Sequence, residues 1–88
     1  MPALALIPPE LLRKVLEADG FALIYEDEFH WYLSKGLSGV PLALPKEKGE
    51  DGMVSMLVME PLLFEAHIDH HKYFALIALV AGQTGPVN

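Results

Sequence analysis

Hydrophobic and polar positions along the chain change period several times, and the first period is that of a helix. Apolar residues at 11, 12, 15 and 16 lie on one face of an amphipathic helix. Pro9 suits the first helical position, where its missing N–H group has no intrahelical partner to lose. Gly20 suits the left-handed residue that follows a helix C-terminus. The pattern therefore predicts a helix that begins at Pro9 and ends before Gly20.

Three short strands are predicted next. Residues 21–25 form an apolar run in which polar and apolar side chains do not alternate. A strand with one solvent-exposed face would show such alternation, so we expect this strand to be covered on both sides. The acidic residues 26–28 mark a turn, and residues 29–33 form the returning strand. Residues 40–44 form a third strand, which Pro45 ends.

The second half of the chain becomes helical after a charged loop at residues 46–52. Residues 53–58 fit either a fourth strand or the beginning of a helix. From Glu60 the pattern is helical, with Pro61 in a first turn. Asp69 is a good N-cap for a last helix at 70–81. That helix is apolar on nearly every side, so we expect it to be buried centrally or shared with another subunit.

These elements predict an α+β domain of order α-β-β-β(-β)-α-α, with an antiparallel sheet and helices on one face. The 88 residues leave room for one domain, in which we expect residues 1–8 to be an N-terminal arm and residues 82–88 a flexible tail. A domain of this size buries a modest fraction of its surface. Because 52% of the residues are hydrophobic, we expect part of the excess to form a homodimer interface.

Charge and composition narrow the classes of function. A net charge of −6 argues against non-specific nucleic-acid binding, although a local patch can still bind RNA. The absence of cysteine excludes disulfides and thiolate metal sites. No basic segment precedes the N-terminal apolar run, and the longest apolar run, 73–81, is about half of a membrane span. We therefore expect a cytoplasmic protein without a membrane segment.

Several stretches resemble the HicA family of small toxin proteins. They are LLRKVLEADGFALI (11–24), PLALP (41–45) and LLFEAHIDHHKYFALI (62–77), together with His30 and the aromatic pair that follows it. The resemblance implies a fold similar to double-stranded-RNA-binding domains, metal-free RNA cleavage without a cofactor, and a small antitoxin protein as partner. The chain departs from the family in having Glu28-Phe29 where Gly-Ser is usual, and His67 where a glycine is expected after Ala66.

His30 stands where the family's catalytic histidine stands, which implies a role as general acid or base. A neutral imidazole can take a proton from a ribose 2′-hydroxyl near neutral pH. The alternatives are a histidine that packs against its aromatic neighbours, or one that only contacts a ligand. The residues that we expect to contact RNA are the basic and aromatic side chains Lys35, Lys46, Lys48, Trp31 and Tyr32.

Two other readings remain open. The first is a non-catalytic interaction module of the same fold, which binds a second copy or an antitoxin-type partner. The second is a histidine-rich metal-binding protein, with His67, His70 and His71 as ligands, because histidines four apart share one face of a helix. If the chain is an enzyme, we expect an endoribonuclease.

Overall fold

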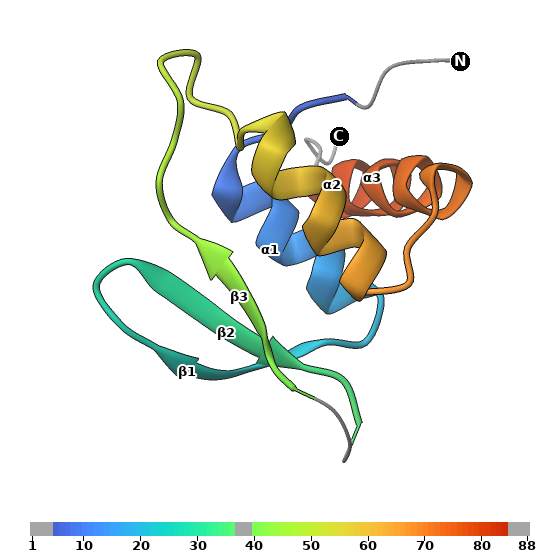
Figure 1. The fold of residues 1–88 in the computed structure, drawn as a ribbon. Helices are drawn as coiled ribbons and strands as arrows, with labels where there is room; N and C mark the ends of the chain where they lie inside the picture. Colours follow the sequence, from blue (N-terminus) through green and yellow to red (C-terminus); the bar gives the residue numbers. More distant parts are fainter. Residues whose placement is uncertain (1–4, 37–39, 85–88) are drawn as a thin grey trace.

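The computed structural model describes residues 5–36 and 40–84 and shows a small α+β fold (Figure 1). A three-stranded antiparallel sheet packs with three helices, which confirms the predicted fold class. For residues 53–58, which fit either a fourth strand or the beginning of a helix, the described residues show no strand, and a helix begins at Met56. In chain order the elements are α1 (Pro9–Ala18), β1 (Ala22–Glu26), β2 (His30–Ser34), β3 (Leu42–Pro45), α2 (Met56–Glu65) and α3 (His70–Thr84).

Helix α1 begins and ends as the sequence predicts. Pro9 occupies its first position, and Gly20 follows the C-terminus with a φ of 106°, a conformation that side chains disfavour. The Phe21 N–H donates to the Leu16 carbonyl at 3.0 Å, which pairs one of the last carbonyls of the helix. The chain thus leaves α1 through a glycine turn and enters β1 directly.

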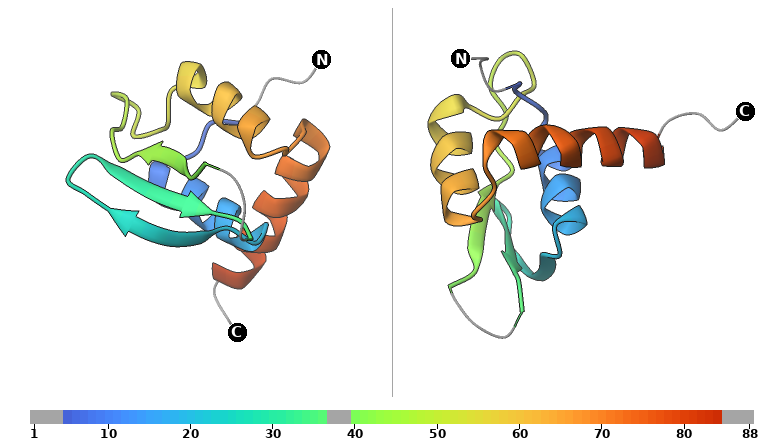
Figure 2. Two further views of the ribbon diagram at one scale, coloured as in Figure 1. Left: turned by 60° about the horizontal axis from the view of Figure 1, so that its bottom comes forward. Right: turned by 90° about the vertical axis from the view of Figure 1, so that its right-hand side faces the viewer.

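The sheet has the order β1-β2-β3, and one of its faces is covered by the helices (Figure 2). Side chains alternate along β2 and β3, so that Trp31, Leu33, Leu42 and Leu44 are buried. The half-exposed residue His30 lies next to Trp31 in the strand and therefore projects from the opposite face. This open face is where the candidate site lies.

Strand β1 lies at an edge of the sheet and is mostly exposed, so the prediction that it has no wet face is wrong. Ile24 is 56% exposed and Tyr25 is 62% exposed, while Leu23 is half-buried. The strand has one neighbour, and its pairing with β2 shifts register between Leu23 and Tyr25. Such a bulge twists an edge strand and hinders pairing with another chain.

Helix α2 begins at Met56, within the segment that we expected to be either a strand or the beginning of a helix, because Ser55 caps it. The Ser55 hydroxyl oxygen accepts a hydrogen bond from the Leu57 N–H at 3.2 Å. Residues 53–58 are therefore a loop that leads into a helix and not a strand. Pro61, which we expected in a first turn, lies inside α2.

The prediction that Asp69 caps α3 is confirmed. Its carboxylate accepts a hydrogen bond from the Lys72 N–H at 2.8 Å. The helix continues to Thr84, so it includes the first part of the predicted tail; residues 85–88 lie outside the described residues. Among the described side chains of α3, those on one side are buried, through Tyr73, Leu76 and Val80, so the helix is not buried centrally. The alternative expectation, that α3 is shared with another subunit, stays a prediction.

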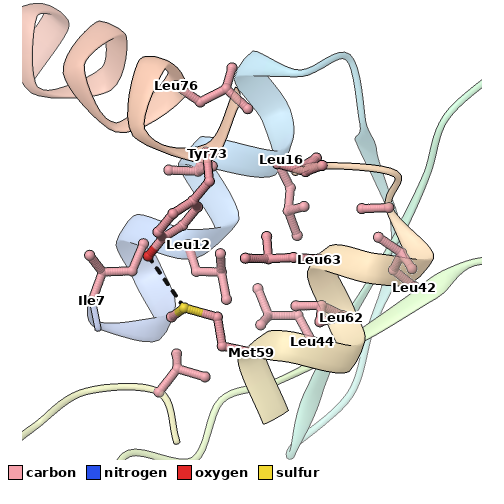
Figure 3. Packing of buried hydrophobic residues seen from close by; sticks show 14 of the residues in the cluster. Ile7, Leu12, Leu16, Leu42, Leu44, Met59, Leu62, Leu63, Tyr73 and Leu76 are labelled. Carbon is pink, nitrogen blue, oxygen red and sulfur yellow. Dashed lines mark hydrogen bonds between the residues drawn. The ribbon is translucent and has the colours of Figure 1, made fainter. Parts of the chain in front are cut away.

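The core joins the N-terminal segment to the helices (Figure 3). Tyr73 is fully buried, and its hydroxyl donates a hydrogen bond to the Ala5 carbonyl and lies 3.3 Å from the Met59 sulfur. Burial raises the pKa of Tyr73 to about 12. The Ile7 carbonyl accepts from the Val54 N–H at 2.8 Å, so this part of the predicted arm is docked. None of the helices in the described chain has the length and apolar character needed to cross a membrane.

Candidate functional site

The hairpin between β1 and β2 is organised by the carboxylate of Asp27. One carboxylate oxygen accepts hydrogen bonds from the backbone N–H groups of Phe29, at 2.9 Å, and His30, at 2.8 Å. The other oxygen accepts from the Tyr32 hydroxyl at 3.0 Å. An aspartate that accepts from backbone groups two and three residues ahead stabilises a turn locally. Asp27 therefore fixes the start of β2, where His30 lies.

His30 lies on the open face with 38% of its side-chain surface exposed, so it is not enclosed by aliphatic side chains. Its Nδ1 atom lies 3.9 Å from a carboxylate oxygen of Asp27, which is longer than a hydrogen bond and close enough for electrostatic interaction. The His30 and Tyr32 rings are 5.9 Å apart between centroids, and the Tyr25 and Tyr32 rings are 5.5 Å apart. The imidazole thus belongs to an exposed row of rings.

Hydrogen bonding keeps the hairpin carboxylate ionised. The backbone N–H of Phe29 makes the largest contribution to lowering the pKa of Asp27, and the N–H of His30 and the Tyr32 hydroxyl lower it further. The hydrogen bond from the Tyr32 hydroxyl to the Asp27 carboxylate raises the pKa of Tyr32, because the carboxylate holds the hydroxyl proton. The site at neutral pH therefore contains a fixed negative charge, a protonated phenol and an accessible imidazole.

We expected Trp31 to contact RNA, but it lies away from the open face. The indole is 8% exposed and belongs to the core cluster. Two cations lie against its ring: Arg13 Cζ and Lys46 Nζ are each 5.4 Å from a ring centroid. The structure thus brings Tyr32 beside His30 and leaves Trp31 as a packing residue.

The three lysines expected to contact RNA do not gather around His30 as free cations. Lys35 pairs with Asp19 at 3.2 Å and Lys48 pairs with Glu10 at 3.2 Å. Lys46 binds the Glu26 carboxylate and donates to the Asp27 carbonyl at 2.7 Å. Ion pairs at a surface are weak, so a phosphate can compete for these lysines.

The three histidines considered as metal ligands are exposed around the α2–α3 turn. His67 lies in the turn with a φ of 59°, whereas His70 and His71 begin α3. Because the turn separates them, the helical spacing that would place His67 and His71 on one face is lost. Across residues 5–36 and 40–84, no group of three histidine, aspartate or glutamate side chains is arranged to hold a metal ion.

The contribution of Asp27 is what sequence reasoning missed. We interpreted the acidic residues 26–28 only as a turn, whereas Asp27 organises that turn and lies beside the imidazole. The available signal was an aspartate in a turn that leads into a strand, because such a side chain commonly accepts a hydrogen bond from the backbone N–H two residues ahead.

No protein-family model, curated protein or solved structure matches this chain. The likeness to HicA proteins therefore depends on the short stretches quoted above.

Proposed function

We propose that this protein is a HicA-like domain that cleaves RNA without a metal ion, with His30 as general acid and base. We further propose that it has the double-stranded-RNA-binding-domain type of fold, acts in the cytoplasm and is controlled by a small antitoxin protein. The observation that carries the proposal is the exposed imidazole of His30 on the open sheet face, beside a carboxylate that three hydrogen bonds hold in place.

The reaction assigned to His30 is an internal transesterification. Its Nε2 atom takes the proton of a ribose 2′-hydroxyl, and the 2′-oxygen attacks the neighbouring phosphorus. The bond from phosphorus to the 5′-oxygen breaks, and the protonated imidazole returns the proton to that oxygen. The products are a 2′,3′-cyclic phosphate and a free 5′-hydroxyl, so protons and electrons balance without a co-reactant.

Asp27 is the positioning residue in this proposal. Its negative charge near Nδ1 favours the tautomer with a proton on that nitrogen, which leaves Nε2 free to accept one. Shortening of the 3.9 Å separation on substrate binding would strengthen this effect, as catalytic contacts commonly tighten in the complex. Tyr32 supports it by donating to the other carboxylate oxygen.

The test is cleavage of RNA by the purified protein in EDTA, with analysis of the product ends. We expect cyclic phosphate ends from the wild type, none from His30→Ala, and an unchanged rate from His71→Ala, whose histidine is exposed on α3. Asp27→Asn should lower the rate by about tenfold or more and change its pH profile. Cleavage by His30→Ala at the wild-type rate would overturn the assignment.

A second candidate function is protein binding without catalysis, and the charge distribution favours it. The exposed rings of Tyr25 and Phe29 and the half-buried ring of Tyr32 lie at the acidic hairpin, and Lys46, which contacts this hairpin, is paired with Glu26. Such a surface suits a homodimer or an antitoxin-type partner better than a polyanion. It predicts that the wild type is inert toward RNA and elutes as a dimer, and that Tyr25→Ala elutes as a monomer.

A further inference from the structure

Helix α2 exposes an apolar stripe along its whole outer side. Leu57 is 86% exposed and Phe64 is 83% exposed, and Pro61 between them is also exposed. These residues are spaced by four and three positions, so they share one face of the helix. The buried residues Met59 and Leu63 lie on the opposite side, which faces the core (Figure 3). The stripe is therefore not needed for folding of this domain.

The stripe borders a cavity of about 720 Å³ at the junction of α2 and α3. Its walls include Met56, Leu63 and Ile68, and the acidic residues Glu60 and Asp69 lie at its edge. An open apolar cavity beside an exposed helical stripe is the geometry that receives the apolar side of another helix. A cavity of this volume is large enough for one or two large side chains.

The negative charges beside the groove favour a basic partner helix over a second copy of this chain as its occupant. Helix α2 has no basic residue, and Glu60 and Glu65 flank the stripe on its two sides, because they lie roughly 70° from its centre on a helical projection. If two copies paired through α2, their carboxylates would face one another, since a two-fold interface places the same patch on both sides. Each copy also has a net charge of −6. A partner with basic residues at matching positions removes this repulsion.

We propose that the α2 groove, defined by Leu57, Glu60, Pro61, Phe64 and the cavity beside them, binds an amphipathic helix of a partner protein that has lysine or arginine along both flanks. Leucine or aromatic side chains of that helix fill the cavity, and its basic residues pair with the flanking glutamates. The groove does not include the open sheet face, so the inference does not depend on a catalytic role for His30.

The probe is a fluorescent synthetic helix with leucine on one face and lysine on both flanks, and its control is the same peptide with glutamate in place of lysine. We expect the wild-type protein to bind the lysine peptide and not the glutamate peptide in anisotropy titrations. Phe64→Ser should weaken binding by about tenfold or more, because it removes the exposed aromatic ring that lines the cavity. Glu60→Gln should weaken it less, and this loss should shrink at high salt.

Phe29→Ser is the matched control, since Phe29 is 66% exposed on the hairpin and lies outside the groove. It should leave binding unchanged. Circular dichroism should show that all three variants remain folded, because each change is at an exposed side chain. Equal binding of both peptides, or unchanged binding by Phe64→Ser, would overturn the proposal. A wild type that sediments as a dimer and a Phe64→Ser variant that sediments as a monomer would also overturn it, in favour of a second copy as occupant.

Discussion

Replacing His67 with glycine should stabilise the protein. His67 is the described non-glycine residue with a positive φ, at 59°, and it follows the C-terminus of α2. The turn closes with the Ile68 N–H donating to the Leu63 carbonyl at 2.9 Å, which is a pattern that usually places glycine at this position. The imidazole is exposed and forms no hydrogen bond with another described residue, so its removal breaks no such contact.

The magnitude follows from two opposing effects. A left-handed conformation costs a residue with a side chain about 1–2 kcal/mol. Glycine avoids this penalty, but it loses about 0.5–1 kcal/mol more conformational entropy on folding. His67→Gly should therefore raise the free energy of unfolding by about 0.5–1 kcal/mol. For a domain of this size the melting temperature should rise by roughly 2–8 °C.

Thermal and urea unfolding, followed by circular dichroism, measure this change. His67→Ala is the control for the side chain, because alanine keeps the unfavourable φ and should leave stability within about 0.5 kcal/mol of the wild type. His71→Gly is the control for composition, and it should lose up to about 1 kcal/mol because glycine disfavours a helix. A His67→Gly variant that is no more stable than the wild type would refute the reasoning.

Three further predictions concern the buried Tyr73, the ion pair of Glu26 with Lys46, and the glycine turn after α1. Because the pKa of Tyr73 is about 12 in the folded protein and 10 in the unfolded chain, its neutral hydroxyl stabilises the folded state below pH 10, and this contribution is lost as the pH rises through 12. The free energy of unfolding of the wild type should therefore fall about 2–3 kcal/mol further across this range than that of Tyr73→Phe. Tyr25→Phe is the control. Glu26→Gln should free Lys46 and strengthen RNA binding severalfold at low salt. Glu28→Gln removes the same charge without freeing that lysine, so its effect should be smaller. Equal effects of the two variants would contradict the idea that Glu26 competes with RNA for Lys46. Gly20→Ala should cost about 1–2 kcal/mol in urea unfolding, because the φ of 106° disfavours a side chain, and an unchanged midpoint would exclude this strain.

The parts of the fold predicted correctly are those with local causes. Helix α1 has a proline start, an apolar face and a glycine end, all of which act within a few residues. The cap at Asp69 is equally local, since it needs one carboxylate and one N–H three residues later. Such features do not depend on the rest of the molecule, which is why the sequence alone was sufficient for them.

The exposure of β1 and the surroundings of His30 depend on neighbours that are distant in sequence. The apolar run in β1 is the same whether the strand is central or at an edge, and only the sheet order shows that Ile24 and Tyr25 are exposed. The start of α2 has a local cause instead: Pro61 indicated a first turn, whereas the cap at Ser55 starts the helix at Met56, five residues before Pro61. The sequence predicted that His30 lies in the returning strand. Only the structure shows that His30 and Trp31 project from opposite faces of the sheet and that His30 lies close to Asp27.

The most direct test of the account compares growth after induced expression of the wild type, His30→Ala and His71→Ala, with the product ends of cleaved RNA recovered from each culture. The account predicts that the wild type and His71→Ala stop growth and leave 2′,3′-cyclic phosphate ends, and that His30→Ala does neither. Equal arrest by the wild type and His30→Ala, or harmless expression of all three, would contradict catalysis by the imidazole on the open face of the sheet.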